Sequence, residues 1–387
     1  MNMKTLGVYI HIPFCRKKCN YCDFFSLGNS EEHINEYIKK LIKEIETSDI
    51  IEHKVDTIFF GGGTPSILSI SQLEKILSAI TKKIHIENNA EITLETNPCT
   101  NNNFQELNQI GFNRISFGVQ SANNNELKFL GRLHTFEEFL KDYNEARKYF
   151  GNINLDLMYG IPLQTLSTWE NTLSQVKDLA PQHISAYSLI IEPNTPFYNQ
   201  ELSLPTEDIE TKMQNMIEEI LHEYSKYEIS NYSLPNFECK HNLKYWNMKD
   251  YIGYGAGAQS FIRTIPKIRG TSRTPSPTTR KVTNECRGGR PRPPETNFID
   301  YRLENSKDLL NWTQTRKKVS HDDFLSEYIF LGLRQTKGIK LTNEILEKYG
   351  EIIDKYVKNN MLISDNNNLK FTPRGMEISN YILSDFI

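Results

Sequence analysis

The feature that most constrains the fold is a series of short apolar runs separated by amphipathic segments over residues 5–232. The runs have the length and composition of buried strands and lie at 6–12, 55–60, 91–96, 114–119, 153–159 and 183–190. Apolar residues recur at helical spacing over 34–45, and Asn29 with Glu32 predicts the N-terminal cap of that helix. Strand–helix units in series predict an α/β fold with a parallel sheet, either doubly wound or curled into a partial barrel.

In either arrangement, ligands bind at the carboxyl ends of the strands. The polar and glycine-rich segments of the sequence fall at these ends. After the first five runs come the cysteine-rich segment 13–25, GGGTPS (61–66), NP (97–98), Gln120 and GIPLQT (160–165). We therefore expect five loops to converge on one rim of the sheet.

The first of these loops contains Cys15, Cys19 and Cys22 within eight positions. Six cysteines with three crowded at one end are typical of a metal site in a reducing compartment, not of a disulfide framework. A structural zinc site needs a fourth ligand, and His11 on an extended strand is a long reach away. A 4Fe–4S cluster has four corners, so three thiolates leave one iron open to an external chelating ligand.

Composition excludes several function classes. Lys plus Arg total 45 and Asp plus Glu total 48, so the net charge of −3 does not indicate a dedicated nucleic-acid binder. The first residues do not resemble a signal peptide, and no run of 18 apolar residues suggests a membrane span. We therefore expect a cytoplasmic protein without a membrane span.

The segment 263–297 differs from the rest of the chain. It holds seven of the fifteen arginines, many prolines and no aromatic residue, a composition that cannot bury a core and that predicts disorder. Basic segments bind phosphate without specificity, and no aromatic side chain is interleaved here for base stacking, so we expect no nucleic-acid partner. The predicted domains are a barrel (1–235), a joining region (236–262), this segment, and a mainly helical, winged-helix-like domain (298–387) with a hairpin around 364–368.

The Cys–x3–Cys–x2–Cys loop resembles the signature of the radical SAM superfamily. The resemblance implies that the open iron takes the amino and carboxylate groups of S-adenosylmethionine (SAM). An electron from the cluster then cleaves the sulfonium to give methionine and a 5′-deoxyadenosyl radical. GGGTPS resembles the family's motif for the SAM amino group, and backbone without Cβ atoms allows a close approach to a charged ligand.

A closer resemblance, to the oxygen-independent coproporphyrinogen oxidase-like family, rests on motifs that occur in order. These are YIHIPFC, FFGGGTPS, ETNP, RISFGVQS, LGRLH, DLMYGIPLQT and ISAYSLIIEPNTPFY, and the match spans 6–260 and resumes at 327–339. It implies an incomplete, roughly six-stranded (βα) barrel of the radical SAM type with a C-terminal helical domain. It also implies a SAM site formed by Tyr9, Tyr21, Gly62, Gly63, Thr64, Glu95, Gln120, Arg132 and Asp156.

Two branches of that family are distinguished by the cysteine loop. The true oxidase has one more cysteine where this chain has Phe24, and it carries an N-terminal extension, whereas the first run here starts near residue 5. Both differences resemble the HemW branch of heme chaperones. The resemblance implies binding of heme, its delivery to an acceptor protein, and an electron donor to the cluster. The alternative is an anaerobic coproporphyrinogen III dehydrogenase.

The sequence ECKHNLKYW (238–246) also resembles the HemW branch, and it makes His241 a candidate heme ligand. The branch usually has Ala-His-Ser where this chain has Ala258, Gln259 and Ser260. That departure removes one candidate ligand.

Overall fold

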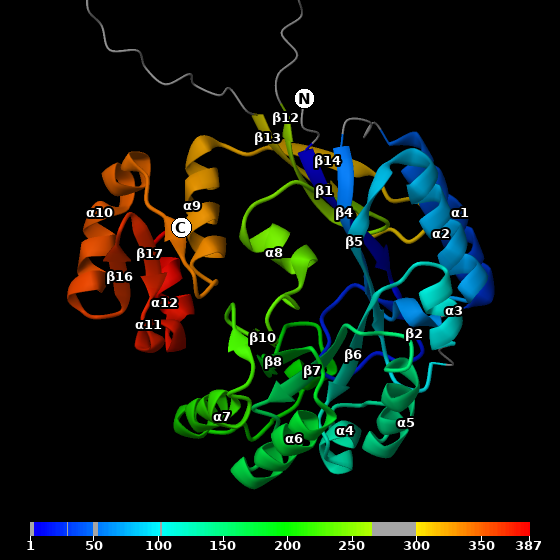
Figure 1. Cartoon of the computed structure of the whole chain (residues 1–387), viewed down its shortest axis with the longest axis horizontal. Helices are drawn as coiled ribbons and strands as arrows, with labels where there is room; N and C mark the ends of the chain where they lie inside the picture. Colours follow the sequence, from blue (N-terminus) through cyan, green and yellow to red (C-terminus); the bar gives the residue numbers. More distant parts are fainter. Residues whose placement is uncertain (1–3, 29, 49–52, 101–102, 265–298) are drawn as a thin grey trace, which may run out of the picture.

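The structure is a computed structural model that describes residues 4–28, 30–48, 53–100, 103–264 and 299–387. The arginine- and proline-rich segment, whose disorder the sequence predicts, lies outside the described residues from position 265 onward. The remaining chain forms a large curved sheet with outer helices and a smaller C-terminal unit (Figure 1).

The six predicted strands are confirmed, and each pairs in parallel with the next along the chain. They are β1 (Lys4–Ile12), β4 (His53–Gly62), β5 (His85–Thr96), β6 (Arg114–Gln120), β7 (Ile153–Tyr159) and β8 (His183–Ser188). The sheet curls around a concave side, which gives the expected partial barrel in place of a flat doubly wound sheet (Figure 1). Parallel strands need crossover helices, and these cover the outer face of the sheet.

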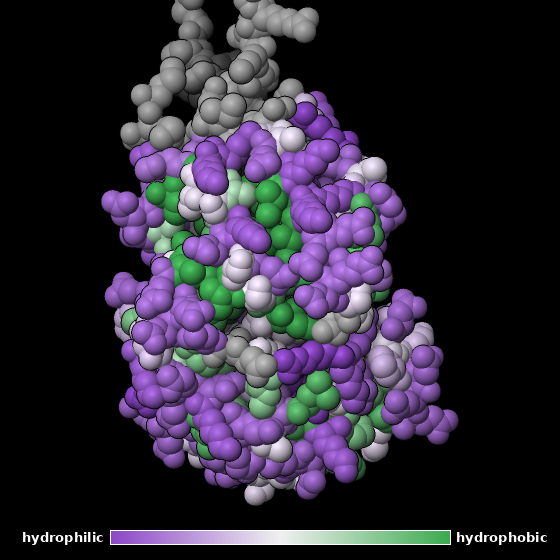
Figure 2. All heavy atoms as spheres, turned by 90° about the vertical axis from the view of Figure 1, so that its right-hand side faces the viewer, coloured by the Kyte–Doolittle hydropathy of each residue, from purple (hydrophilic) through white to green (hydrophobic). Residues whose placement is uncertain are grey.

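The outer helices are α1 (Glu31–Thr47), α2 (Ile70–Lys83), α3 (Phe104–Gln109), α4 (Asn124–Phe129), α5 (Phe136–Ala146), α6 (Leu166–Leu179) and α7 (Glu207–Ile220). Their apolar faces pack on the sheet to form the main core. Figure 2 views the side of the molecule that carries α1 and α2, where hydrophilic residues predominate and apolar side chains gather in a central band.

The cap of α1 differs from the prediction. Ser30, not Asn29, is the N-cap, and its hydroxyl accepts a hydrogen bond from the His33 N–H at 3.2 Å. Ser30 has extended backbone angles, which let a short side-chain oxygen turn back to the first free N–H groups of the helix. Asn29 itself lies outside the described residues.

The sheet continues beyond both ends of the parallel series. At one end, β11 (Tyr251–Tyr254) pairs in parallel with β1, and β12 (Gln259–Thr264), β13 (Ile299–Asn305) and β14 (Gln314–Lys318) follow in antiparallel order. At the other end, β8 pairs with β10 (Asn231–Ser233), which pairs with β9 (Ser225–Lys226). Residues 299–318, which we expected to group with the C-terminal helices, therefore extend the barrel sheet instead.

Two short strands and two 3₁₀ turns complete the barrel. They are β2 (Phe14–Cys15), β3 (Leu27–Gly28), η1 (Pro65–Ile67) and η2 (Pro196–Asn199). The pairing of β2 with β3 closes the base of the cysteine loop, because it brings the start and the end of that loop together.

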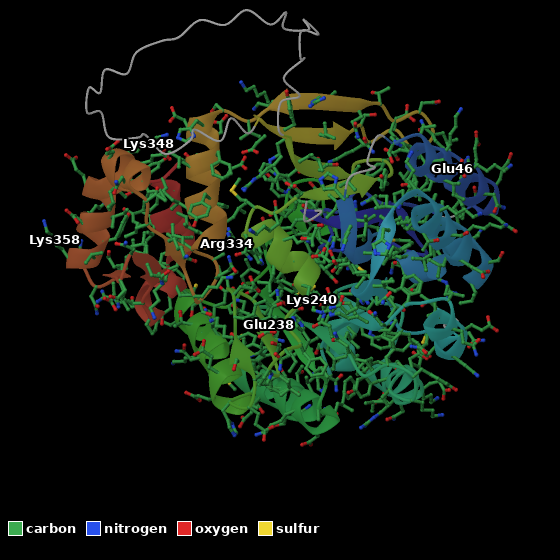
Figure 3. All side chains as sticks on the ribbon, turned by 45° about the horizontal axis from the view of Figure 1, so that its top comes forward. Glu46, Glu238, Lys240, Arg334, Lys348 and Lys358 are labelled. Carbon is green, nitrogen blue, oxygen red and sulfur yellow. The ribbon has the colours of Figure 1, made fainter. Side chains whose placement is uncertain are left out.

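The C-terminal unit has its own hydrophobic core, as the winged-helix-like prediction implies. It consists of α9 (His321–Gly332), β15 (Ile339–Lys340), α10 (Asn343–Lys358), β16 (Leu362–Asp365), β17 (Asn368–Phe371), α11 (Pro373–Glu377) and α12 (Ser379–Ser384). The hairpin expected around 364–368 is the β16–β17 pair. Figure 3 shows Arg334 at the border with the barrel, where its guanidinium lies 5.7 Å from the Trp246 ring, and Lys348 and Lys358 on α10.

Helix α8 (Lys240–Trp246) lies on the concave side of the sheet, between the barrel and the C-terminal unit (Figure 1). It contacts both β4 and α9. In the described residues we find no helix long and apolar enough to cross a membrane. Since α8 touches both units, its side chains help to form the cavities on either side of it.

Candidate functional site

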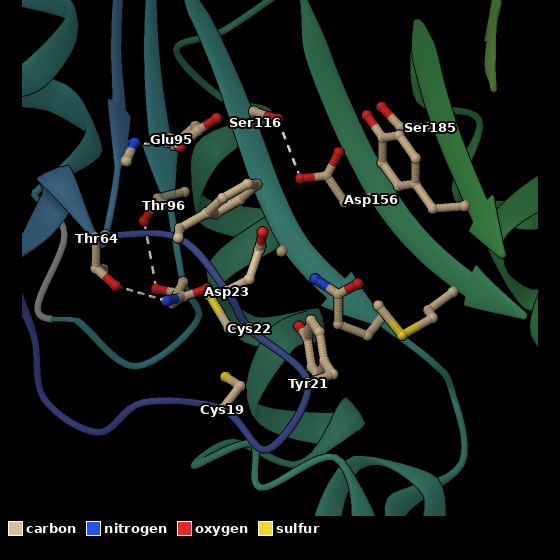
Figure 4. A pocket seen from close by; sticks show the side chains of 18 of the residues that line it. Cys19, Tyr21, Cys22, Asp23, Thr64, Glu95, Thr96, Ser116, Asp156 and Ser185 are labelled. Atoms are coloured by element: carbon tan, nitrogen blue, oxygen red, sulfur yellow. Dashed lines mark hydrogen bonds between the residues drawn. The ribbon is translucent and has the colours of Figure 1, made fainter. Parts of the chain in front are cut away.

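A cavity of about 660 Å³ lies on the concave side of the sheet, and side chains from β1, β4, β5, β6, β7 and β8 reach it. All three predicted cysteines and all nine residues predicted to contact SAM line this one cavity. They are Tyr9, Cys15, Cys19, Tyr21, Cys22, Gly62, Gly63, Thr64, Glu95, Gln120, Arg132 and Asp156. Figure 4 shows Cys19, Tyr21 and Cys22 facing Glu95 and Asp156 across the opening. We call this space the cofactor pocket.

The cysteine loop is held in place by hydrogen bonds of its main chain and of the Asn20 side chain. The Asn20 N–H donates to the Leu130 carbonyl at 3.0 Å, and the Asn20 side-chain amide donates to the Phe129 carbonyl at 2.8 Å. The Leu27 N–H donates to the Pro13 carbonyl at 2.7 Å. Because these contacts reach a helix over 100 residues away in the chain, the loop is fixed to the barrel and not only to its own ends.

Polar groups surround the sulfur atoms. The Thr64 hydroxyl lies 3.5 Å from the Cys15 sulfur, and the Arg132 guanidinium donates to the Cys19 sulfur at 3.4 Å. Burial, together with the neighbouring thiols, raises the pKa of Cys22 to about 11 in the metal-free protein. A bound cation inverts this tendency, because a coordinating thiol loses its proton.

The three thiols of the loop provide the ligands that an iron–sulfur cluster needs. Within the part of the chain that the structure describes, no three His, Cys, Asp or Glu side chains converge closely enough to hold one metal ion. In an iron–sulfur cluster each cysteine binds a separate iron, so the thiols surround the cluster instead of meeting at a point. Three thiols facing one opening therefore fit a 4Fe–4S cluster with one iron free for another ligand.

Besides the contact of the Thr64 hydroxyl with Cys15, the GGGTPS loop contacts the cysteine loop through its backbone. The Gly63 N–H donates to the Ile12 carbonyl at 2.9 Å, and the Thr64 N–H donates to the Phe14 carbonyl at 2.8 Å. A Cβ atom on Gly63 would lie 2.7 Å from the Phe14 carbonyl oxygen, so no side chain fits there. Gly62 adopts φ +111°, a backbone conformation that residues with a side chain rarely adopt. The glycines thus let two loops meet at the edge of the pocket.

A chain of side-chain hydrogen bonds crosses the pocket wall. The Asn97 amide donates to the Thr64 hydroxyl at 2.9 Å, and its oxygen accepts from the Arg132 guanidinium at 2.6 Å. Arg132 also donates to the Gly118 carbonyl. Its Nε atom, by contrast, is buried and has no hydrogen-bond partner in the described structure. The network leaves a positively charged group with one free donor at the wall of the pocket.

The opposite wall carries two carboxylates. Burial, and then the nearby Asp156, raises the pKa of Glu95 to about 8, while the Gly62 N–H donates to Glu95 at 3.2 Å and opposes that rise. Burial also raises the pKa of Asp156. Two buried carboxyl groups that disfavour each other's charge are well suited to a cationic ligand, since a cation stabilises both charged forms. SAM carries an ammonium and a sulfonium, so the residues present fit it.

Gln120 marks an irregularity at the end of β6. Its φ is +73°, and the register with β7 shifts between Gly118 and Gln120. A bulge of this kind re-aims a side chain, and a non-glycine residue in this region of φ/ψ space stores strain that often occurs at functional sites. The Gln120 side chain lines the pocket from this distorted strand end.

One of the five loops expected at the rim does not reach it. Residues 160–165, all of which the structure describes, do not line the pocket. Gln164 in this loop is buried and donates to Glu126 at 3.0 Å. The loop instead leads into α6, whose cap at Thr165 it forms.

The structure adds residues that sequence reasoning missed. Arg114, Asn154 and His183 form a polar floor, on which the Asn154 amide donates to Asp156 at 2.7 Å and its oxygen lies 2.5 Å from His183 Nδ1. The sequence feature that could have identified these residues is the alternation of side chains between the two faces of a strand. Polar or glycine residues recur at 114, 116, 118 and 120 and at 154 and 156, on the face that in a barrel points inward.

His241 does not line the cofactor pocket. Its side chain is fully buried, with Nδ1 2.9 Å from the Thr57 hydroxyl and Nε2 2.8 Å from the Tyr245 hydroxyl. Burial, and then the positive charges of Lys244 and Arg114, lowers the pKa of His241 to about 3, so the ring is neutral. Both ring nitrogens are therefore occupied by hydrogen bonds in this conformation.

Comparisons with known families agree with this geometry. Residues 9–176 match the radical SAM superfamily, and residues 319–378 match the HemN C-terminal domain. The solved structure of coproporphyrinogen III oxidase (HemN) from Escherichia coli aligns with a TM-score of 0.78, over 99% of this chain and 90% of that chain. At 20% sequence identity this similarity shows the fold alone.

Sequence relatives assign the chain to a narrower family. The heme chaperone HemW of Lactococcus lactis is 34% identical over 100% of this chain and 98% of its own length. HemW of Escherichia coli is 38% identical over 72% of this chain and 76% of its own length. HemW of Buchnera aphidicola is 45% identical over 68% of this chain and 72% of its own length. The chain belongs to the HemW family of radical SAM proteins.

Proposed function

We propose that this protein is a heme chaperone that binds a 4Fe–4S cluster, SAM and heme and passes the heme to an acceptor protein. The observation that carries the proposal is the convergence of three thiols and nine further residues on one pocket, in a chain that is similar along its whole length to a protein named heme chaperone. Cytoplasmic location and an electron donor to the cluster belong to the same proposal.

The residues present would hold the two cofactors on opposite sides of the pocket. Cys15, Cys19 and Cys22 would bind the cluster, and Glu95 and Asp156 would face the positive charges of SAM. When bound, a reduced cluster with SAM supplies one-electron cleavage of the sulfonium. The chain's own contribution is positional, since the glycine contacts and the Arg132 network fix both walls before a ligand arrives.

A specific observation disfavours the alternative function, anaerobic coproporphyrinogen III dehydrogenase. The oxidase has an additional cysteine where this chain has Phe24, which lines the cofactor pocket and is 62% exposed. An exposed aromatic side chain at the mouth of a pocket offers apolar contact area and no metal ligand. The residue at this position therefore favours the chaperone function over the oxidase function.

His241 stays a prediction as a heme ligand. For its imidazole to bind iron, a hydrogen bond to Thr57 or to Tyr245 has to break, because both ring nitrogens are engaged. The cost of freeing one buried nitrogen is on the order of 1–3 kcal/mol, which a metal–ligand bond can offset. Ligation by His241 thus requires local rearrangement of α8.

Anaerobic assays separate the two functions. We expect the reconstituted protein to bind heme, as measured by a Soret-band titration, and to form no protoporphyrinogen from coproporphyrinogen III in the presence of SAM and a reductant. Production of protoporphyrinogen would refute the chaperone proposal. A matched titration of His241→Ala checks the ligand prediction, and equal heme affinity and an equal spectrum in the two proteins would remove His241 from the site.

A further inference from the structure

A second cavity, of about 620 Å³, lies between α8, strands β12–β14 and helix α9. We call it the interdomain pocket, because its walls come from both the barrel sheet and the C-terminal unit. In Figure 1, α9 runs alongside α8 and the β12–β13 end of the sheet, which places this space at the open side of the barrel. Neither the cysteines nor the residues that face SAM line it.

The floor of the interdomain pocket is apolar and aromatic. Met248, Tyr251, Phe261 and Val319 form a buried cluster that is separate from the cores of the two units. Leu331 of α9 packs against it from the C-terminal side. A ligand pocket is usually apolar with a few polar groups at fixed places, and this one has the size that such sites show.

Charged groups lie at the rim of the pocket, and they differ in whether they have an ion-pair partner. Arg302 forms an ion pair with Glu327 and donates to the Tyr251 hydroxyl at 3.1 Å, so its charge is neutralised. Among the described residues, no carboxylate lies within 4.0 Å of the ammonium of Lys317 or Lys318, both of which are exposed on β14. The remaining acid in the lining is Asp323, on α9. Asp323 also interacts electrostatically with Lys317. Side chains alternate along a strand, and Lys318 pairs across the sheet with Tyr301, which lines the cavity on the outer side, so Lys317 is the lysine whose side chain faces the rim of this pocket.

The two pockets share one side chain. Tyr245 of α8 lines both the cofactor pocket and the interdomain pocket, and its hydroxyl is the partner of His241. Its ring also packs edge-on against Tyr251, with 4.6 Å between the centroids. A ligand in the interdomain pocket would therefore lie one aromatic residue away from both His241 and the SAM side of the barrel.

We propose that the interdomain pocket is the docking site for the heme, with Lys317 at the rim pairing one of its propionates. The inference rests on the proposed function, because it takes heme as the cargo. Heme is a planar apolar ring with two carboxylates on one edge, which matches an apolar, aromatic floor with the exposed cation of Lys317 at its rim. The walls belong to two units with separate hydrophobic cores, so a movement of one unit relative to the other would open the pocket and expose the cargo to an acceptor.

The first test removes the cation at the rim. We expect Lys317→Ala to weaken heme binding about threefold, the loss of one exposed ion pair. Arg316→Ala is the matched control, because Arg316 is on the same strand but stacks on Tyr301 and lines a different cavity on the outer side of the sheet. It removes one positive charge from β14 and should leave heme affinity unchanged.

The second test adds a ligand. Gln259 is exposed and lines the interdomain pocket from β12, so Gln259→His places an imidazole on its wall. We expect this variant to bind ferric heme several-fold more tightly and to shift the Soret band, since imidazole is a strong axial ligand. Gln259→Ala should retain the wild-type spectrum, which separates ligation from a change of shape.

The outcomes separate this inference from the proposed function. Wild-type protein that binds no heme would refute both. Wild-type protein that binds heme, with unchanged affinity in Lys317→Ala and an unchanged spectrum in Gln259→His, would overturn the interdomain site and leave the chaperone function standing. Weaker binding in Arg316→Ala alone would move the heme to the outer cavity and would likewise overturn the proposal.

Discussion

The cofactor pocket and the interdomain pocket have similar volumes, about 660 and 620 Å³, but they are built in different ways. The cofactor pocket lies within one sheet, and hydrogen bonds of the main chain fix the loops around it. The interdomain pocket lies between two units, each with its own core, and its charged contact across the boundary is the Arg302–Glu327 pair. Figure 1 shows the same contrast between a continuous curved sheet and a separate unit beside it.

This contrast indicates that the cofactor pocket is the preorganised site. Chemistry on a reactive cofactor needs groups that do not move, and backbone donors and glycine contacts provide such rigidity. Cargo that has to be released needs walls that separate, and an interface between two units provides this more easily than a sheet does. Each of the following substitutions disrupts either the cofactor pocket or the boundary between the two units.

The largest expected effect is on the cluster. Replacing Cys15, Cys19 or Cys22 by Ala should abolish cluster assembly after anaerobic reconstitution, because two thiolates and an open iron leave half the cluster unsupported. The measurement is iron content per chain, for which we expect about four irons in the wild type. Cys99→Ala is the control, since this thiol lies outside the pocket lining.

Cys239 provides a second control, because it is buried and its sulfur lies 3.7 Å from a Glu91 oxygen. Loss of iron in Cys239→Ala or Cys99→Ala, with retention in one of the three loop variants, would reassign the cluster ligands. Heme binding should survive in the loop variants if the two pockets are independent, which tests the comparison directly.

The next effect is a pH dependence within the cofactor pocket. Burial and Asp156 raise the pKa of Glu95 from 4.5 to about 8, so the folded protein holds this proton more tightly than the unfolded chain does. The stability that this provides is present below the ordinary pKa and is lost as the pH rises through about 8. Glu95→Gln removes this titration. The melting temperature of the variant should therefore rise relative to that of the wild type as the pH increases from about 6 to about 9.

We expect that gain to be roughly 3 °C or more in the cofactor-free protein, because about 1 kcal/mol shifts the midpoint of a domain of this size by roughly 2–4 °C. Glu87→Gln, on the same strand but outside the pocket, serves as the control and should follow the pH profile of the wild type. A constant difference between Glu95→Gln and the wild type across this range would contradict the assignment of a raised pKa.

The smallest expected effect is on the boundary between the units. Arg302→Gln removes the ion pair with Glu327, whose side chains are 28% and 35% exposed, so the free energy of unfolding should fall by roughly 1 kcal/mol or less. Hydrogen exchange should accelerate in α9 and remain unchanged in β4 and β5. Faster exchange in the parallel strands would show that the boundary also supports the cofactor pocket.

Much of the barrel and of its pocket could be predicted from the sequence. Strands and helices have local periods, and the carboxyl ends of parallel strands meet at one rim, so the cysteine loop and GGGTPS were expected to come together. Figure 4 shows that they do. Resemblance to a family supplied Tyr9, Tyr21 and Arg132, whose side chains have no distinctive local signal.

The remaining features depend on contacts between distant segments. Residues 299–318 join the barrel sheet because β13 finds partners in β12 and β14, and no local pattern specifies which edge a strand will pair with. Likewise, the sequence makes His241 a candidate ligand, and only the fold shows that Thr57 and Tyr245 form hydrogen bonds with both of its ring nitrogens. The period of a segment is encoded in its own residues, whereas its partners and its burial are decided by packing across the whole chain.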